Sequence, residues 1–419
     1  MRILFIDHSS HAAGAAVSLR YLAAGLIARG HDVHVALVWP SQELEAYYAS
    51  AGLTVHALPG FPTVPHTTAG WVRFSSPRSI RGLIRLARHY RPAAAQLHAL
   101  VAKVSPDIVH LNSVTLLSAA FALRKSPVRV IWHIRESPPF GGRGWRTSAI
   151  AGMMRSAVAR TIFISRDDQS MWTKGAVGTV VYCCTPTPTG PRRQTAEALR
   201  AELGLAPSDR VVLFVGGFQE IKGFQVLCRA FPLVCRAIPE ARLVIIGANV
   251  PPPASRLAAF ARRYGRYFGI RAYHDRCQRL LEESVPSSRR VVKPLVPNVA
   301  DYLDLCEFLV FPSVRPHFAR PVIEAALSGK PSIASRFGGI REVVSEGDGA
   351  VLVPPGDPVA LADAMIAMLG DSERTRSMGC RAREFAGQKF TVDLHVDAVE
   401  KVYAGALGGD VPGQHGGDG

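Results

Sequence analysis

The sequence has 419 residues, of which 48% are hydrophobic and 20% are charged, and its formal net charge is +16. This length and composition are ordinary for a globular chain with two domains, and they exclude a disordered or fibrous protein. The longest apolar run, residues 114–123, is too short to cross a bilayer, and residues 1–7 predict a strand, not a signal sequence. The seven cysteines show no metal-ligand spacing, so we expect reduced thiols and a cytoplasmic protein.

The positive charge is concentrated in the N-terminal half of the chain. Residues 1–190 contain 20 Lys and Arg against 8 Asp and Glu, a balance of +12. Such a surface attracts phosphates, anionic lipid headgroups or nucleic acid. An arginine-rich composition that keeps the protein soluble explains the same count, so both interpretations stay open.

The first half of the chain alternates buried strands with helices, which is typical of a parallel α/β sheet. The loop after the first strand contains Gly14, but it matches the Gly-x-Gly-x-x-Gly signature poorly, and no acidic residue closes the second strand. A nicotinamide cofactor is therefore not expected. The predicted strands are 2–7, 30–38, 106–112, 129–134 and 161–165, and helices are predicted at about 17–29 and 71–90, with Ser165 or Asp167 capping a further helix.

The predicted helix at 71–90 has a basic face. Arg81, Arg85 and Arg88 recur at helical spacing, with apolar residues among them. An ordinary surface helix packed on the sheet has this pattern. A helix that docks on an anionic membrane has it too, and the sequence leaves both alternatives open.

The second half begins a new alternation of strands and helices after a Pro- and Thr-rich linker at residues 185–194. A buried strand at 210–215 runs into Gly216 and Gly217, and Lys222 follows at the head of a helix that ends near residue 237. A cation, free backbone amides and a helix N-terminus converge there, which favours diphosphate binding. The alternative is a solvated lysine at a helix start. The next strand, 242–247, ends at Gly247, and Asn249 forms its tip.

The stretch from residue 308 to residue 357 alternates in the same way. A strand at 308–311 is followed by a helix that opens at residues 321 and 322, a strand at 331–334 and a glycine turn at 338–339. The pattern places Glu324 in the first turn of its helix. A carboxylate there either satisfies the free amides of the helix or accepts hydroxyl hydrogen bonds from a ribose.

This stretch resembles the donor site of the retaining GT-B glycosyltransferases of the group 1 / family 4 type. The pattern of that family comprises a Pro-Ser pair, a glutamate that opens a helix, Gly-x-Pro, Gly-Gly-x-x-Glu and Gly-Asp-Pro. The residues in register with it are Pro312, Ser313, Glu324, Gly329, Pro331, Gly338, Gly339, Glu342, Gly356, Asp357 and Pro358.

The resemblance implies an α/β fold of the GT-B class, with two Rossmann-like domains facing across a cleft and a C-terminal helix that crosses back to the N-terminal domain. Residues 1–188 would form the N-terminal, acceptor-binding domain, together with the crossing helix at about 390–405. Residues 195–385 would form the nucleotide-sugar-binding domain, and the tail 406–419 is expected to be disordered.

The resemblance also implies a retaining hexosyltransferase of polysaccharide biosynthesis. The donor would be a nucleotide-sugar of the UDP or GDP type, and the acceptor a glycan, a lipid-linked sugar or a small molecule. No cofactor is expected, and no metal, because the chain has no Asp-x-Asp pair. The protein would be cytoplasmic, with a peripheral contact to the inner face of an anionic membrane as an option.

The resemblance assigns catalytic roles to His133 and Lys222, although His133 also fits a satisfied core histidine. Lys222 would stabilise the leaving diphosphate. The residues expected to bind the donor are Gly14, Gly216, Gly217, Lys222, Gly247, Asn249, His317, Phe318, Ala319, Arg320 and Glu324.

The sequence departs from the family at two donor contacts. Pro316 occupies the position of the first glutamate, and Gly217 that of a phosphate-binding arginine, whose charge Arg320 could replace. A non-catalytic nucleotide-sugar-binding subunit is therefore the alternative function. A nucleic-acid binder is not expected, because no aromatic platform accompanies the arginines. The sequence does not indicate a function for the basic segment 251–290.

Overall fold

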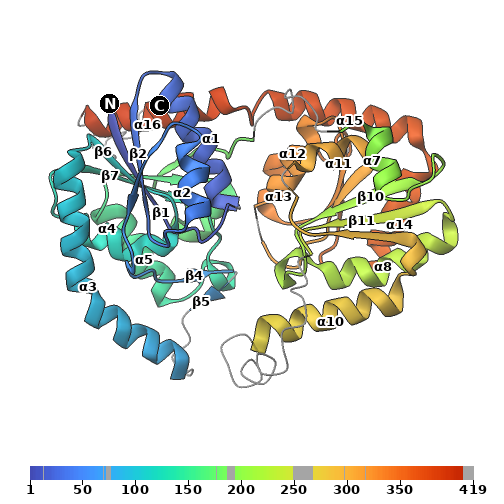
Figure 1. Ribbon diagram of the computed structural model, residues 1–419, viewed down its shortest axis with the longest axis horizontal. Helices are drawn as coiled ribbons and strands as arrows, with labels where there is room; N and C mark the ends of the chain where they lie inside the picture. The colour runs from blue at the N-terminus through green and yellow to red at the C-terminus, as the bar shows by residue number, and fades with distance from the viewer. Residues whose placement is uncertain are drawn as a thin grey trace, which may run out of the picture. The chain divides into compact units, whose positions relative to one another are not determined.

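The computed structural model describes residues 1–12, 14–68, 70–71, 77–175, 177–185, 194–248, 268–296, 298–316 and 318–408. The chain divides into two compact units, each with its own parallel sheet (Figure 1). Unit 1 comprises Met1–Thr185 and Phe390–Gly419, and unit 2 comprises Pro186–Lys389. Both units are Rossmann-like α/β structures, as the alternation of strands and helices predicts.

Seven strands of the described residues form the parallel sheet of unit 1, in the order β3-β2-β1-β6-β7-β8-β9. The central strands are mostly apolar because helices cover both faces of the sheet. Their bounds are β1 (Arg2–Asp7), β2 (Asp32–Leu37), β3 (Thr54–Ala57), β6 (Ile108–Leu111), β7 (Arg129–Ile134), β8 (Arg160–Phe163) and β9 (Thr179–Val180). A separate antiparallel hairpin pairs β4 (His66–Thr67) with β5 (Gly70–Trp71).

The helices of unit 1 agree with the predicted ones in place but not always in length. Helix α1 begins at Gly14, not near residue 17, and the predicted basic helix is α3, which runs on to Val104. Ser165 caps α6 by accepting a hydrogen bond from the Asp168 amide, as predicted. The bounds are α1 (Gly14–Ala28), α2 (Gln42–Ala49), α3 (Pro77–Val104), α4 (Leu117–Leu123), α5 (Trp145–Ser156) and α6 (Arg166–Thr173), with short 3-10 turns η1 (Val114–Leu116) and η2 (Pro139–Gly142).

The chain returns to unit 1 through α16 (Val392–Leu407), which packs against α1 (Figure 1). Gly25 of α1 allows this close approach, since a Cβ atom there would lie 2.6 Å from Cγ2 of Val396. Arg29 adds ion pairs to Asp397 and Glu400 at 2.5 and 2.6 Å. The helix ends at Leu407 instead of residue 405, so residues 406 and 407 are helical and the prediction of a disordered tail from residue 406 was wrong there. The rest of that tail, from residue 409, lies outside the described residues.

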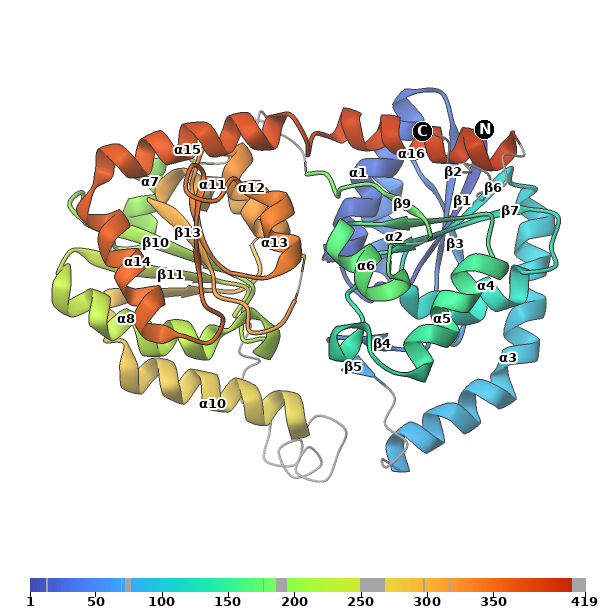
Figure 2. The ribbon, with the colours of Figure 1, turned by 180° about the vertical axis from the view of Figure 1, so that it is seen from behind.

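Unit 2 has a parallel sheet of six strands within the described residues, in the order β12-β11-β10-β13-β14-β15. Figure 2 shows α8, α10 and α14 on one face of this sheet, where they share an apolar core with the strands. The strands are β10 (Arg210–Val215), β11 (Ala241–Ile246), β12 (Arg290–Lys293), β13 (Phe308–Phe311), β14 (Ser332–Ser335) and β15 (Ala350–Val353). The helices are α7 (Ala196–Glu202), α8 (Phe224–Ala237), α10 (Phe268–Ser284), α11 (Val299–Leu305), α12 (Arg320–Leu327), α13 (Gly338–Val343), α14 (Pro358–Gly370) and α15 (Ser372–Gly387), with 3-10 turns η3 (Glu220–Lys222) and η4 (Ser287–Arg289).

Each sheet reverses its strand order once. The chain builds outward from β1 to β3 and then continues on the other side of β1 with β6, and β13 lies beside β10 in the same way. Ligands of open α/β sheets bind beyond the carboxyl ends of the strands at such a reversal. The candidate site residues are therefore sought at these two sheet edges.

Two further expectations concern the periphery of unit 2. The predicted linker lies outside the described residues from 186 to 193, and so does most of the first half of the basic segment 251–290, up to residue 267. The second half of that segment forms α10, η4 and the start of β12. None of the helices in the described part of the chain combines the length and the apolar character needed to span a bilayer.

Candidate nucleotide-binding site

Two glycine turns at the carboxyl ends of β10 and β11 form the base of the site in unit 2. The amides of Gly216 and Gly217 both donate to the carbonyl of Ile246, each at 3.1 Å. Gly217 has a φ of +60°, and a Cβ atom there would lie 2.1 Å from the carbonyl oxygen of Gly247. A side chain at residue 217 therefore has no room. This is the physical reason why the family's arginine cannot occupy that position on this backbone.

Lys222 lies against the first of these turns. A Cβ atom on Gly216 would be 3.2 Å from Cγ of Lys222, so the glycine leaves space for the buried aliphatic stem. The ammonium nitrogen lies 5.0 Å from the centre of the Phe311 ring, within cation–π range. Burial lowers the pKa of Lys222 to about 7; the charge of Arg320 contributes to the shift, and that of Glu324 opposes it. The structure does not support the alternative of a solvated lysine.

The start of α8 and the loop after β13 are in backbone contact. A Cβ atom on Gly223 would lie 1.7 Å from the carbonyl oxygen of Pro312, and the Val314 amide donates to the Ile221 carbonyl at 3.1 Å. No side chain caps the N-terminus of α8, which begins directly after Gly223. Its first amides and the positive end of its dipole therefore lie beside Lys222, where they favour an anion.

Glu324 pairs with Arg320 within α12. The helix begins at Arg320, so Glu324 lies in the second turn and not in the first, which corrects the prediction. Its Oε1 atom is 2.9 Å from Nε of Arg320, and both side chains are partly exposed. Glu324 lies too far into α12 to cap its N-terminus, and none of the described side chains caps the helix, so the alternative of a helix-capping glutamate does not describe this structure. The side chains of Arg320 and Glu324 are near enough to Lys222 for their charges to act on its pKa.

The structure thus brings six predicted donor-site residues to one edge of unit 2: Gly216, Gly217, Lys222, Gly247, Arg320 and Glu324. Ala319 is the buried N-cap of α12, and Phe318 precedes it, partly buried. Asn249 and His317 lie outside the described residues. Gly14 belongs to unit 1, where it is the exposed first residue of α1.

His133 lies inside unit 1. It follows Ile131 on the same face of β7, and its side chain is fully buried (0% exposed) between the sheet and α16. Its Nδ1 atom is 3.1 Å from Nε2 of His110, whose Nδ1 is 2.7 Å from the Tyr403 hydroxyl. The ring of His395 lies 6.2 Å away, centre to centre. His133 therefore lies in the core of unit 1. A core histidine is the alternative that the sequence left open to a histidine facing the donor.

The three histidines of this cluster are held neutral. Burial lowers the pKa of His110 and His133 well below the usual value, and that of His395 to about 3. The positive charge of Arg135 is the second cause in each case.

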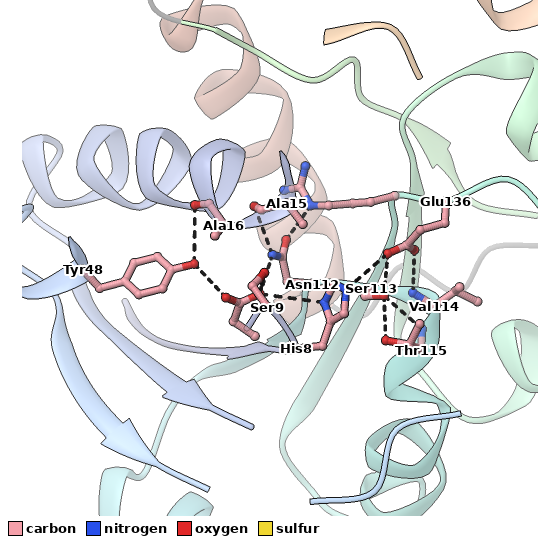
Figure 3. A network of polar contacts seen from close by, with 12 residues as sticks. His8, Ser9, Ala15, Ala16, Tyr48, Asn112, Ser113, Val114, Thr115 and Glu136 are labelled. Carbon is pink, nitrogen blue, oxygen red and sulfur yellow. Dashed lines mark hydrogen bonds and ion pairs between the residues drawn. The ribbon is translucent and has the colours of Figure 1, made fainter. Parts of the chain in front are cut away.

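A second polar cluster, at the carboxyl ends of β1, β6 and β7, was not singled out from the sequence (Figure 3). His8 and Glu136 are its partly accessible members, and Asp7, Asn112 and Ser113 are buried. The residues come from three separate parts of the chain, and only the strand order brings them together. A polar residue directly after each of three buried strands is the signal that could have indicated the cluster.

Fold and site together describe a two-unit α/β protein with a candidate nucleotide-binding edge in unit 2. Residues 12–214 match the family model described as Glycosyltransferase Family 4, and residues 209–371 match that described as Glycosyl transferases group 1. The chain belongs to this family of glycosyltransferases.

Curated relatives support the same family. The N-acetyl-alpha-D-glucosaminyl L-malate synthase of Bacillus anthracis is 27% identical over 216 residues, 52% of this chain and 51% of the relative. The D-inositol 3-phosphate glycosyltransferase of Xylanimonas cellulosilytica is 34% identical over 226 residues, 53% of this chain and 49% of the relative. The chain thus spans about half the length of the curated relatives it matches.

Solved structures share the fold. HepE of Anabaena in complex with UDP and glucose gives a TM-score of 0.74 at 18% identity, covering 96% of this chain and 99% of that one. The sucrose-phosphate synthase of Thermosynechococcus elongatus gives 0.72 at 20% identity, covering 98% and 100%. At these identities the comparison establishes the GT-B fold alone.

The glycine turns lead to a first prediction. Gly217→Arg, which restores the family residue, should weaken UDP binding and lower the urea midpoint, because its side chain meets the Gly247 carbonyl. Gly347→Ala is the matched control: its φ is also positive (+84°), but nothing lies within 4 Å of a Cβ atom there. The control variant should lower the free energy of unfolding only by the backbone strain, about 1 kcal/mol. Tighter UDP binding by Gly217→Arg would contradict this account.

The buried histidines predict a pH dependence of stability. Their pKa values are lower in the folded state than in the unfolded state, so the unfolded chain binds more protons below about pH 6.5. The contribution of these histidines to the free energy of unfolding should be constant above that pH and fall by up to about 1.4 kcal/mol per pH unit for each histidine below it. Urea denaturation between pH 7.5 and 4.5 measures this slope. His133→Asn should reduce the slope, whereas the exposed His98→Asn should leave it unchanged.

Proposed function

We propose that the protein transfers a sugar from a nucleotide-diphosphate donor of the UDP or GDP type to a glycan, a lipid-linked sugar or a small-molecule acceptor. The observation that carries the proposal is the convergence of Lys222, Arg320 and Glu324 at the glycine-rich edge of unit 2. A cation and free amides suit the diphosphate, and a carboxylate suits the ribose hydroxyls.

The names of the relatives support a nucleotide-sugar chemistry. The curated relatives are named as a synthase of a glucosaminyl malate and as inositol phosphate glycosyltransferases, and the HepE structure holds UDP and glucose. These names differ in their acceptors, so they support the class of reaction more than the identity of the acceptor.

In the proposed mechanism, the bond between the sugar and the diphosphate breaks with its electron pair on the diphosphate. Lys222 and the amides at the start of α8 stabilise this developing charge. The acceptor oxygen bonds to the anomeric carbon on the face from which the diphosphate leaves, which retains the configuration, and the hydroxyl proton passes to the departing phosphate oxygen. Because the chain lacks an Asp-x-Asp pair, the proposal assigns the charge to these groups and not to a metal.

Arg320 takes the place of the family's missing arginine in this proposal. Gly217 cannot carry a side chain, and Arg320 is the cation that lies close to Lys222 and Glu324. Its pairing with Glu324 also orients the carboxylate before the nucleotide binds. The acceptor is assigned to unit 1, as the family resemblance implies.

We extend the proposal to a peripheral contact between unit 1 and an anionic membrane. Phe140 and Trp145 flank a glycine-rich turn and are 62% and 70% exposed, and Arg143 between them is exposed as well. Gly142 ties this turn to α6, because a Cβ atom there would lie 2.0 Å from the Met171 carbonyl oxygen. Exposed aromatic and basic side chains together suit the interface of an anionic bilayer.

The donor site is tested by Glu324→Ala. The variant should bind UDP or GDP roughly 10- to 100-fold more weakly, because hydrogen bonds from the ribose to a charged acceptor are lost. Its melting temperature should change little. Isothermal titration measures the affinity, and the exposed Glu240→Ala of unit 2 is the control. Unfolding of Glu324→Ala with unchanged affinity in the folded fraction would contradict the assignment.

Turnover is tested separately from binding. Release of free UDP or GDP from a panel of nucleotide-sugars, in the presence of a mixture of candidate acceptors, is the expected result for a transferase. Saturable donor binding without release would identify the non-catalytic subunit instead.

The lowered pKa of Lys222 predicts how donor binding depends on pH. With a pKa of about 7 in the free protein, the ammonium form is populated below pH 7 and lost above it. Because a diphosphate favours the ammonium form, UDP affinity should fall as pH rises above 7, and binding near pH 7.5 should take up a proton. Titrations in buffers of different ionisation enthalpy measure this uptake. Lys222→Arg, which stays protonated, should abolish it.

The membrane contact is tested by co-sedimentation with vesicles. The protein should bind vesicles rich in phosphatidylglycerol and not those of pure phosphatidylcholine, with binding that weakens as salt rises. Phe140→Ser and Trp145→Ser should each reduce binding several-fold. Phe121→Ser, which removes an exposed aromatic residue of α4, is the control and should bind as the wild type does.

A further inference from the structure

The polar cluster at the strand ends of unit 1 contains two carboxylates that the protein holds rigidly. Asp7 is fully buried and accepts three hydrogen bonds, from the Tyr48 hydroxyl at 2.8 Å, Ser9 Oγ at 3.0 Å and Asn112 Nδ2 at 3.2 Å. Burial raises the pKa of the Tyr48 hydroxyl, and the nearby carboxylate of Asp7 adds to the shift, so Tyr48 remains a hydrogen-bond donor.

Glu136 is fixed in a different way, because it keeps one side toward solvent. Its Oε1 atom accepts a hydrogen bond from Ser113 Oγ at 2.6 Å, and its Oε2 atom accepts one from the Val114 amide at 3.0 Å. Its side chain is 22% exposed. Each carboxylate oxygen can accept a second hydrogen bond, so Glu136 retains accepting capacity that a ligand can reach.

His8 stands between these carboxylates at ion-pair distance, marked by dashed lines in Figure 3, and makes a hydrogen bond to neither. Its Nε2 atom is 3.7 Å from Oε1 of Glu136, and its Nδ1 atom is 3.9 Å from Oδ1 of Asp7, both longer than a hydrogen bond. Nδ1 is buried and lacks a hydrogen-bond partner among the described residues. The side chain is 23% exposed, so the imidazole is accessible and its hydrogen bonds are incomplete.

From this geometry we infer that His8 and Glu136 bind a hydroxyl group of the acceptor. The inference rests on the proposed function and names the part of unit 1 that receives the acceptor. A hydroxyl on the solvent side of the pair can donate to Glu136 Oε1 and exchange a second hydrogen bond with Nε2 of His8. A group that both donates and accepts satisfies the two side chains at once.

The chemistry of the pair also selects the class of ligand. A hydroxyl group can donate to Glu136, whereas an ionised phosphate or carboxylate group of a ligand has no proton to donate at this position. An apolar group would leave the carboxylate of Glu136 desolvated and without a new partner. The ligand is therefore a neutral polyhydroxylated molecule, such as a sugar or a cyclitol, or the hydroxyl-bearing part of a larger acceptor.

Saturation-transfer NMR on the full chain tests the inference, with myo-inositol and methyl α-glucoside as probes. Either probe should receive saturation from the wild-type protein. Its affinity should fall about tenfold or more in Glu136→Gln and in His8→Ala, as expected for a hydrogen bond involving a charged group. Because His8 makes no hydrogen bond to Asp7 or Glu136, His8→Ala leaves the Asp7 and Glu136 networks intact. It therefore remains informative if Glu136→Gln fails to fold.

The control variant is Glu45→Gln, an exposed carboxylate of α2, which should bind the probes as the wild type does. UDP titration of every variant distinguishes an effect on the site in unit 2 from an effect on the site in unit 1. The His8→Ala variant should bind UDP with the affinity of the wild type. Equal probe affinity in wild type and variants would overturn the inference, and so would a wild-type protein that binds UDP but neither probe. A wild-type protein that binds no nucleotide would refute the proposed function and overturn this inference with it.

Discussion

The burial of one ammonium group is the constraint on which the nucleotide-binding edge of unit 2 depends. Lys222 sits against Gly216 and over the Phe311 ring, where little water reaches it. Desolvation disfavours its charged form, which is why its pKa is low. A bound diphosphate would reverse that cost, because it supplies the negative charge that water no longer screens. The fold thus desolvates the ammonium group before the ligand arrives, and this desolvation strengthens the attraction between Lys222 and a diphosphate.

The glycines around Lys222 follow from the same constraint. The β10 and β11 turns approach so closely that residue 217 must lack a side chain, and Gly223 approaches the Pro312 carbonyl in the same manner. These contacts fix the lysine relative to both turns. They also exclude the arginine that the family pattern implies for the β10 turn, so a second cation has to come from another element. Arg320, at the start of α12, is in reach because β13 lies next to β10 in the sheet.

Much of this arrangement could be predicted from the sequence, because strands and glycine turns have local signals. Buried runs followed by glycines identified β10 and β11, and the helix start at residue 320 was placed within two residues. The orientation of His133 could not be predicted, since it depends on a helix that begins at residue 392. The cluster around His8 was missed for a similar reason: strand order, which no local pattern encodes, joins residues 8, 113 and 136. The roles of Asn249 and His317 stay predictions.

The two sheet edges offer different groups to a ligand, and this difference fits the proposed roles of the two units. The edge of unit 2 offers a lysine, an arginine and the amides of a helix start, a set that favours phosphate oxygens. The edge of unit 1 offers the carboxylates of Asp7 and Glu136 beside His8, and the guanidinium of Arg135, which donates to Asn112, offsets part of their charge. Glu136 can accept hydrogen bonds from hydroxyl groups but not from ionised phosphate oxygens, which have no proton to donate. In the proposed transferase, the hydrogen-bonding chemistry of each edge therefore favours a different one of the two substrates.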